Sequence, residues 1–432
     1  SAASDVYKRQ VLMTAKKSFI WNMLGSLSAA AISVVLLMVV TRFLTPIDSD
    51  SYAFAYSFAN MMVVIALFQV RNYQATDIGE KYSFSQYFLA RLITCFLMLA
   101  ISGIYLLVTS HDAYKSQVIL LVCLYRLTDA FSDLYQGMFQ QHERLDIAGK
   151  SLTFRNSLIF IIYTLIIICF RNLVFALQVT CLLSFLFILF YDVRKGRSFE
   201  TVAFCSFKNR DNQLKSLQLL KESFPLFLNG FLIIYIYTQP KYAIETLTHL
   251  NKIPLGSQTI FNILFMPAFV MNLMMLFFRP HITQMAIALV KGQVERFKTI
   301  QVTLFSYLAG LMVVVLIGSG LLGIPFLSLL YATPLKAFWL AFMTIMLGGA
   351  VGSFATAIDN ILKAMRKQQY LLIPYMGSFL VSLFITSDLV ETYHIFGAAL
   401  SFLLTMTVWL FLSVFLYVII MKRFKKEFIQ GK

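Results

Sequence analysis

Three charged residues lie in the middle of an apolar stretch, residues 117–138, where charge is costly. Arg126 is followed by Asp129 and Asp133 at i+3 and i+7, so on a helix the three side chains lie within about 60° of one another. An arginine near the bilayer centre costs roughly 2.5–3.5 kcal/mol on insertion scales. This face either forms an internal ion pair, Arg126 with Asp129, that joins helices, or lines a water-filled cavity. The formal charge of the three residues is −1, which leaves Arg126 only partly free to bind an anion.

Polar residues in two other apolar segments are further candidates. Asn22 begins a stripe of small residues in segment 19–41, and such a stripe is typical of close helix packing or of a ligand site. Asp359 lies near the inner end of segment 337–362, where it could cap a helix or act in a gate.

Segment 224–247 carries a polar group at each end. Asn229 lies near its start, and Lys241 and Glu245 form an opposite-charge pair at i, i+4 near its end. Pro240 removes a helical hydrogen bond, so we expect it to disturb the helix. The pair is then either a surface pair or a gate aided by the break.

The elements that must position these residues are membrane-spanning helices. Hydrophobic residues make up 59% of the 432 and charged residues only 13%, against roughly 25% charged in soluble domains. A spanning helix needs about 20 mostly apolar residues. Twelve segments qualify: 19–41, 52–70, 88–109, 117–138, 156–170, 172–191, 224–247, 256–278, 301–322, 337–362, 370–387 and 395–420. The fold class is therefore an all-α polytopic membrane protein.

Charge distribution sets the orientation. With the N-terminus inside, 29 of the 36 Lys and Arg residues fall in inner segments and 6 in outer ones. Such an excess marks the cytoplasmic side, so both termini are predicted to be cytoplasmic. The net charge of +16 comes in small clusters without a basic domain, which argues against a nucleic-acid partner.

The longest polar stretch, the basic segment 192–222, divides the spans into two sets of six. We therefore expect an N-terminal lobe at 13–191, a cytoplasmic linker at 192–222, a C-terminal lobe at 223–421 and a basic cytoplasmic tail at 422–432. Residues 1–12 precede Met13 and are interpreted as a non-native extension. Two equal bundles are a transporter arrangement, with the substrate site near the bilayer midplane.

Enzymatic and metal-binding patterns are missing from the sequence. It contains no GxxxxGK[ST], GxSxG or HExxH motif. The five cysteines are scattered without metal or disulfide spacing. We therefore expect a transporter without a metal site or cofactor and not an enzyme.

Several motifs, in order, resemble the oligosaccharide repeat-unit flippases of the multidrug/oligosaccharidyl-lipid/polysaccharide exporter superfamily. They are SFIWNMLGSLSAAAISVVLLMVVTRFL (18–44), RNYQATDIGEKYSFSQYFLARLIT (71–94), YRLTDAFSDLYQGMFQQHERLDIAGK (125–150), QPKYAIE (239–245) and FNILFMPAFVMNL (261–273). The resemblance implies two six-helix lobes in a V shape, alternating access, and a place in the bacterial cytoplasmic membrane.

The resemblance also implies the cargo: an undecaprenyl-pyrophosphate-linked oligosaccharide used for capsule, teichoic acid or another surface polysaccharide. Related flippases meet the pyrophosphate with cationic cavity residues, and here Arg126 is the nearest candidate, followed by Arg71 and Lys241. Arg42 lies at the outer mouth. Membrane lipids and polysaccharide-assembly proteins are the further partners that this role implies.

Three other functions stay open. A cation-coupled multidrug exporter of the same superfamily would use Asp129 and Asp133 as H⁺ or Na⁺ sites. A membrane polysaccharide polymerase or ligase would be expected to carry a sizeable outer catalytic loop, which the span map lacks. A structural scaffold without transport would tolerate the loss of Arg126.

Overall fold

A computed structural model describes residues 2–75, 77, 79–109, 111–202, 207 and 209–430. Within these it describes the side chains of residues 18–268, 271, 274–275, 278, 280–289 and 291–422 wherever the backbone is described. The described residues form helices joined by turns and short loops, with no strand among them. This confirms the all-α class.

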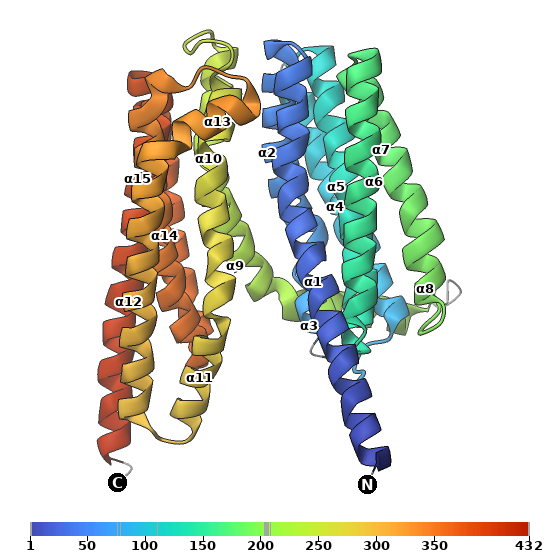
Figure 1. The fold of residues 1–432 in the computed structure, drawn as a ribbon, viewed down its shortest axis with the longest axis vertical. Coiled ribbons are helices and arrows are strands. Elements are labelled where there is room, and N and C mark those ends of the chain that lie inside the picture. Colours follow the sequence, from blue (N-terminus) through green and yellow to red (C-terminus); the bar gives the residue numbers. More distant parts are fainter. Residues whose placement is uncertain are drawn as a thin grey trace. The chain divides into compact units, whose positions relative to one another are not determined.

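The chain divides into two compact units, Ser1–Phe231 and Leu232–Lys432. The first unit contains α1 (Ala2–Phe43), α2 (Pro46–Leu67), α3 (Val70–Gln74), α4 (Phe84–Val108), α5 (Ala113–Gln141), α6 (Leu145–Phe170), α7 (Leu173–Phe187), the π-helix η1 (Ile188–Val193) and α8 (Arg194–Gly196). Helix α9 (Arg210–His249) contributes its first half to this unit and its second half to the next. In the first unit α3, α8 and the N-terminus lie at the same end (Figure 1).

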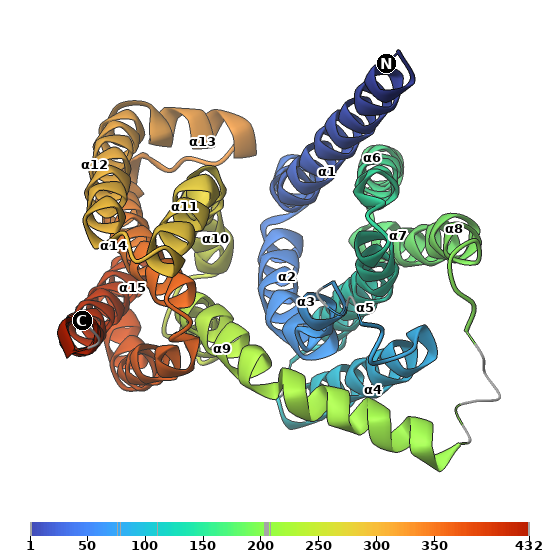
Figure 2. The same ribbon diagram turned by 90° about the horizontal axis from the view of Figure 1, so that it is seen from below.

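The second unit continues with α10 (Ser257–Met274), η3 (Met275–Phe278), α11 (Arg279–Val290), α12 (Val294–Gly318), η4 (Ser319–Gly323), α13 (Ile324–Tyr331), η5 (Lys336–Phe338), α14 (Trp339–Ala364), η6 (Gln368–Leu371) and α15 (Leu372–Gln430). Helix α15 breaks at His394, where φ is 52° and ψ is −129°. The break separates the two predicted spans 370–387 and 395–420. Figure 2 shows α10 to α15 gathered as a bundle.

Nine helical stretches of the described chain are long and apolar enough to cross a membrane. One of them, Gln368–Lys422, contains both halves of α15. Helices α5 and α10 are not among these nine stretches, for which only the described residues count. In α5 the charges of Arg126, Asp129 and Asp133 interrupt the apolar run. With these two helices and with α15 counted as two, the described chain has the twelve predicted spans.

The structure differs from the predicted chain division at the linker, and it also describes the helix around Pro240 and the first residues of the chain. The segment 192–222 is not a linker throughout, because α8 occupies its start, α9 already begins at Arg210, and the division between the units falls inside α9 at residue 231. Helix α9 also continues past Pro240 to His249, so this proline does not end the helix. Residues 2–12, predicted as an extension, continue α1.

The first half of α9 is anchored to the first unit by an ionic contact. The Lys81 ammonium lies 2.8 Å from Glu222 Oε1, and the Tyr73 hydroxyl donates to Glu222 Oε2 at 2.6 Å. This hydrogen-bonded carboxylate raises the pKa of Lys81. One turn further along α9, the Phe227 ring stacks on Phe68 with 4.2 Å between ring centroids. These contacts explain why this half of α9 belongs to the first unit.

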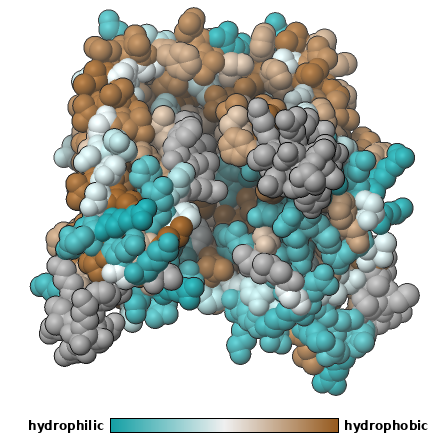
Figure 3. Space-filling view, turned by 60° about the horizontal axis from the view of Figure 1, so that its bottom comes forward, coloured by the Kyte–Doolittle hydropathy of each residue, from teal (hydrophilic) through white to brown (hydrophobic). Residues whose placement is uncertain are grey.

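In each unit the hydrophilic and the hydrophobic surface are separated. Hydrophilic residues gather toward the end of each unit that is turned forward in the space-filling view, with hydrophobic surface behind them (Figure 3). Phe19, Phe96, Leu107 and Val314 are examples of large apolar side chains that are more than half exposed. An apolar outer surface of this extent needs lipid as its solvent.

Helices α1 and α6 approach closely through two glycines. A Cβ atom added at Gly149 would lie 2.2 Å from the Trp21 carbonyl oxygen, and one added at Gly25 would lie 2.9 Å from the Gly149 carbonyl oxygen. Asn22 lies at this crossing, because its backbone nitrogen is also within 2.6 Å of the added Gly149 Cβ. The small-residue stripe of α1 therefore serves helix packing.

We expect Gly149→Ala to destabilise the protein, because the new methyl group meets backbone that cannot move aside. Overpacking of this kind costs about 1–3 kcal/mol. Thermal unfolding of the purified protein in detergent measures the effect. The control is Gly103→Ala in α4, where the added Cβ meets nothing within 4 Å. Equal unfolding temperatures for the two variants would show that the close crossing does not hold α1 on α6.

Candidate functional site

The middle of α5 holds one carboxylate between two arginines from two helices. Asp129 forms an ion pair with Arg126, one turn earlier on α5, and another with Arg155 of α6. The Arg126 guanidinium also lies over the Tyr56 ring of α2, 5.8 Å from its centroid. We call Arg126, Asp129 and Arg155 the Asp129 cluster. Ion pairs join α5 to α6, and the cation–π contact adds α2.

A second carboxylate repeats this arrangement one turn along α5, about 6 Å further by helical rise. Asp133 Oδ1 lies 3.1 Å from Arg71 Nη1 of α3, and its Oδ2 lies 2.9 Å from Arg91 Nη2 of α4. Arg71 also donates to the side-chain oxygens of Gln136 at 3.0 Å and Gln140 at 3.3 Å. We call Arg71, Arg91 and Asp133 the Asp133 cluster.

The two arginines of each cluster differ in burial. The side chains of Arg91 and Arg155 are 0% and 3% exposed, whereas those of Arg71 and Arg126 are 28% and 22% exposed. A fully buried guanidinium without a counter-ion is strongly destabilising, so the aspartates are needed for the buried arginines. The other two arginines keep part of their side chains at the surface of the unit.

Both clusters together are cationic. Four guanidinium groups face two carboxylates, so their formal charge is +2. The charge of −1 for Arg126, Asp129 and Asp133 alone becomes +2 for the clusters because α3, α4 and α6 supply three more arginines. The formal charge of the site remains positive when the nearby carboxylate of Asp192 is included.

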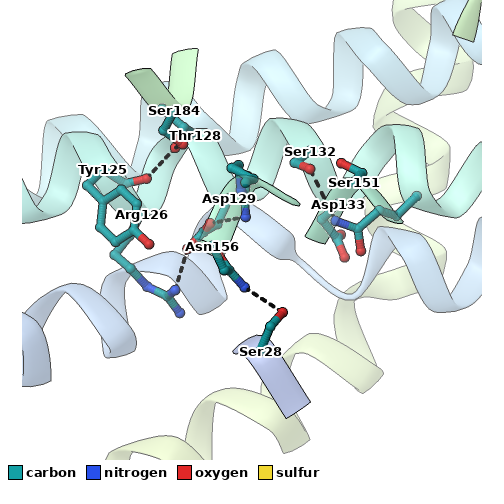
Figure 4. Close-up of polar contacts among 12 residues, drawn as sticks. Ser28, Tyr125, Arg126, Thr128, Asp129, Ser132, Asp133, Ser151, Asn156 and Ser184 are labelled. Carbon is teal, nitrogen blue, oxygen red and sulfur yellow. Dashed lines mark hydrogen bonds and ion pairs between the residues drawn. The ribbon is translucent and has the colours of Figure 1, made fainter. Parts of the chain in front are cut away.

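Asp192 is buried in a hydroxyl cage beside these clusters. It lies on the π-helix η1 and accepts hydrogen bonds from Ser132 at 2.8 Å and Ser151 at 2.5 Å. Ser132 and Asp129 are neighbours on α5, while Ser151 and Arg155 are one turn apart on α6. Figure 4 shows these polar side chains of α5 and α6 facing one another.

Two further hydrogen bonds extend the polar interior of the first unit. Asn156 of α6 donates to Ser28 of α1 at 3.1 Å, and the hydroxyls of Thr128 and Ser184 lie 2.6 Å apart (Figure 4). The predicted ion pair of Arg126 with Asp129 thus exists, but as part of a network over several helices. The lone ion pair and the lined cavity were posed as alternatives, yet the cluster joins helices and still leaves Arg126 partly exposed.

None of the remaining predicted residues forms an ion pair with the two clusters among the contacts described for the first unit. Asn229 is half buried in the first half of α9, and Arg42 is exposed in the last turn of α1. In the second unit the Lys241 ammonium lies 4.7 Å from the centroid of the Phe265 ring, and Glu245 is buried. The roles predicted for these residues in binding or gating stay predictions.

Asp359 connects helices of the second unit through hydrogen bonds. Its carboxylate accepts hydrogen bonds from the hydroxyls of Tyr375 at 2.7 Å and Ser413 at 3.1 Å. These partners lie on the two halves of α15, on either side of the break at His394. Asp359 is 1% exposed, so in this structure it links α14 to both halves of α15.

Sequence reasoning missed three residues of the site. Arg91 is the fourth residue of the predicted span 88–109, so the charge count assigns it to the cytoplasmic side and not to the membrane interior. Arg155 and Asp192 border the predicted spans 156–170 and 172–191. Because α6 begins at Leu145 and α7 is continued by η1, both residues are within helices. The sequence signal that could have identified Arg155 was its spacing from Ser151, since residues at i and i+4 share one face of a helix.

Comparison with known proteins identifies the family. A family model described as polysaccharide biosynthesis protein matches residues 15–247, more than half of the chain. The chain belongs to this family. The capsular polysaccharide biosynthesis protein CapF of Staphylococcus aureus is 26% identical over 172 residues, which are 39% of this chain and 42% of that protein. The match therefore spans less than half of the length of CapF.

Solved structures share the fold over nearly the whole chain. A MATE protein in complex with MaL6 has a TM-score of 0.64 at 12% identity and covers 96% of this chain and 97% of its own. An inward-facing multidrug resistance MATE transporter of the MOP superfamily has a TM-score of 0.61 at 14% identity, covering 95% and 96%. Family, apolar spans and fold together make this chain a multi-pass membrane protein of the polysaccharide biosynthesis family, with a fold like that of the MATE transporters.

We expect Asp133→Asn to lower the free energy of unfolding by about 3–5 kcal/mol, because it leaves Arg91 buried without its carboxylate. Combining it with Arg91→Met should cost less than the sum of the single changes, as a double-mutant cycle of thermal unfolding would measure. The control is Glu391→Gln, which breaks an ion pair with Lys252 that is about half exposed and should cost about 0–1 kcal/mol. Additive effects would show that Asp133 does not stabilise Arg91.

Proposed function

We propose that the protein is a flippase that moves undecaprenyl-pyrophosphate-linked oligosaccharide units from the cytoplasmic to the outer leaflet. The family's role in polysaccharide biosynthesis and the partial likeness to CapF favour capsule or another cell-surface polysaccharide as the destination. The single observation that carries the proposal is the pair of cationic clusters on α5, each with one arginine that is partly exposed.

The clusters suit a phosphate ligand because their carboxylates hold the arginines in place without using all their donors. Nε and Nη1 of Arg155 and Nε of Arg126 are buried and have no hydrogen-bond partner among the described residues. Buried donors are normally paired. Guanidinium groups bind phosphate oxygens bidentately, and a diphosphate carries more charge than a single aspartate, so it can compete for Arg126.

The two partly exposed arginines lie at different levels along α5, and this arrangement gives the diphosphate a route. Arg71 reaches Asp133, toward the end of α5 that is predicted to be cytoplasmic, whereas Arg126 lies near the middle of the helix. From Arg126 to Asp133 is seven residues, or about 10 Å of helical rise. We infer that the diphosphate meets Arg71 first and Arg126 afterwards.

Alternating access of the two lobes would complete the transfer. A diphosphate and its sugars are too polar to cross about 30 Å of hydrocarbon, whereas the undecaprenyl tail can remain in the bilayer while the headgroup passes. Rocking of repeated bundles about a midplane site is the mechanism expected of such folds. Coupling to H⁺ or Na⁺ stays a prediction.

Replacing Arg126 by Gln should slow flipping by about 10- to 100-fold, since a hydrogen bond to a charged group contributes about 1.5–3 kcal/mol. The rate is measured in proteoliposomes with a fluorescent undecaprenyl-diphosphate oligosaccharide. Arg126→Lys keeps the charge without the bidentate geometry and should lie between the two rates. Lys252→Gln, at an exposed site of the second unit, is the matched control for the loss of one positive charge. Arg126→Gln at the wild-type rate would overturn the assignment.

The cation-coupled drug exporter is the second candidate, favoured by the shared fold with MATE transporters. Against it, each of the two carboxylates already bridges two guanidinium groups, which leaves them poor sites for a further cation. A deletion strain separates the two functions. Accumulated lipid-linked glycan with unchanged drug susceptibility supports the flippase, and the reverse result supports the exporter. A polymerase or ligase would instead be revealed by glycan chain extension with the purified protein.

A further inference from the structure

A cavity of about 400 Å³ lies in the first unit, apart from the arginine clusters. Its walls come from α4, α5, α7, η1 and the segment 197–202, and they are mainly aromatic and aliphatic, including Phe84, Phe88, Phe131, Tyr135 and Ile188. The volume lies within the roughly 300–1,000 Å³ of small-molecule sites.

This cavity and the arginine clusters lie on opposite faces of α5. Thr128, Phe131 and Tyr135 line the cavity, whereas Arg126, Asp129 and Asp133 form the clusters. At 100° per residue the two sets are about 150° apart around the helix. The cavity is therefore a separate site from the proposed diphosphate route.

The mouth of the cavity belongs to the lipid-facing surface. Phe185 and Leu189 line it and are 52% and 42% exposed. Exposed apolar side chains on a spanning helix are solvated by lipid chains. A hydrocarbon chain can therefore enter the cavity directly from the bilayer.

A basic group lies at one end of the cavity. Arg197 lines it, and the neighbouring Arg194 and Lys195 are exposed. The close approach of Gly196 fixes this segment against the cavity wall, since a Cβ there would lie 2.8 Å from the Tyr135 ring. Among the residues that the structure describes, no carboxylate forms an ion pair with these three cations.

One acidic residue also lines the cavity. Glu200 accepts a hydrogen bond from the Phe84 backbone N–H at 3.3 Å, at the start of α4, and burial raises its pKa. It is thus occupied as a helix cap, and the neighbouring cations outnumber it.

We propose that this cavity binds one acyl chain of an anionic phospholipid of the cytoplasmic leaflet, with the lipid phosphate held by Arg197 and supported by Arg194 and Lys195. The apolar walls match the chain and the basic end matches the headgroup. Basic pockets between helices on the cytoplasmic side of a membrane protein bind anionic headgroups in this way. The site is distinct from that of the transported lipid.

Native mass spectrometry of the full-length protein measures the binding with two probes, dioleoylphosphatidylglycerol and dioleoylphosphatidylcholine. We expect phosphatidylglycerol to be retained in preference, and Arg197→Gln to weaken its retention about five-fold, as expected for one basic residue near an anionic surface. Lys298→Gln is the control, because it removes an exposed cation from the second unit. Equal retention of the two lipids by the wild type, or unchanged retention by Arg197→Gln, would overturn the proposal.

A second pair of variants tests the cavity without touching its charge. Leu189→Trp places a large side chain at the mouth and should reduce phosphatidylglycerol retention. Leu182→Trp, seven residues earlier on the exposed side of α7 and outside the cavity lining, should not. If both variants retain the lipid fully, the chain does not enter here. Displacement of phosphatidylglycerol by equimolar undecaprenyl phosphate would assign the cavity to the transported lipid and also reject the proposal.

Discussion

A charge inside a membrane protein must be paired, and this constraint organises the first unit. Asp129 and Asp133 are each held by two arginines, one buried and one partly exposed. The carboxylates make it possible to bury Arg91 and Arg155, and in return these arginines fix α4 and α6 against α5. The same pairing leaves a net positive charge in the interior, and this charge is the basis of the anion site that we propose.

Helix α5 contributes to both the arginine clusters and the cavity of the first unit. One face carries the ionic clusters and the opposite face carries aromatic residues of a lipid-accessible cavity. The charges needed for the first face keep α5 from meeting a simple measure of membrane-spanning apolarity. Its neighbours supply the compensating partners, which is how a helix with three central charges can remain in the bilayer.

The fold alone does not select the cargo. MATE proteins at 12–14% identity share it over nearly the whole chain. A fold of this kind can serve different substrates because function depends on the side chains of the site. In this protein the informative feature is the excess of arginine over aspartate in the two clusters, which α3, α4 and α6 supply.

The sequence by itself determined the membrane class, the twelve spans and the importance of Arg126, Asp129 and Asp133, because hydropathy and helical spacing are local properties of the chain. It did not reveal that Arg91 and Arg155 complete the clusters, since their ion pairs join residues 42 and 26 positions apart. The charge of three residues on one helix, −1, did not give the charge of the site. Only the tertiary structure decided that the two clusters are cationic, because the net charge of a buried site depends on which helices pack together.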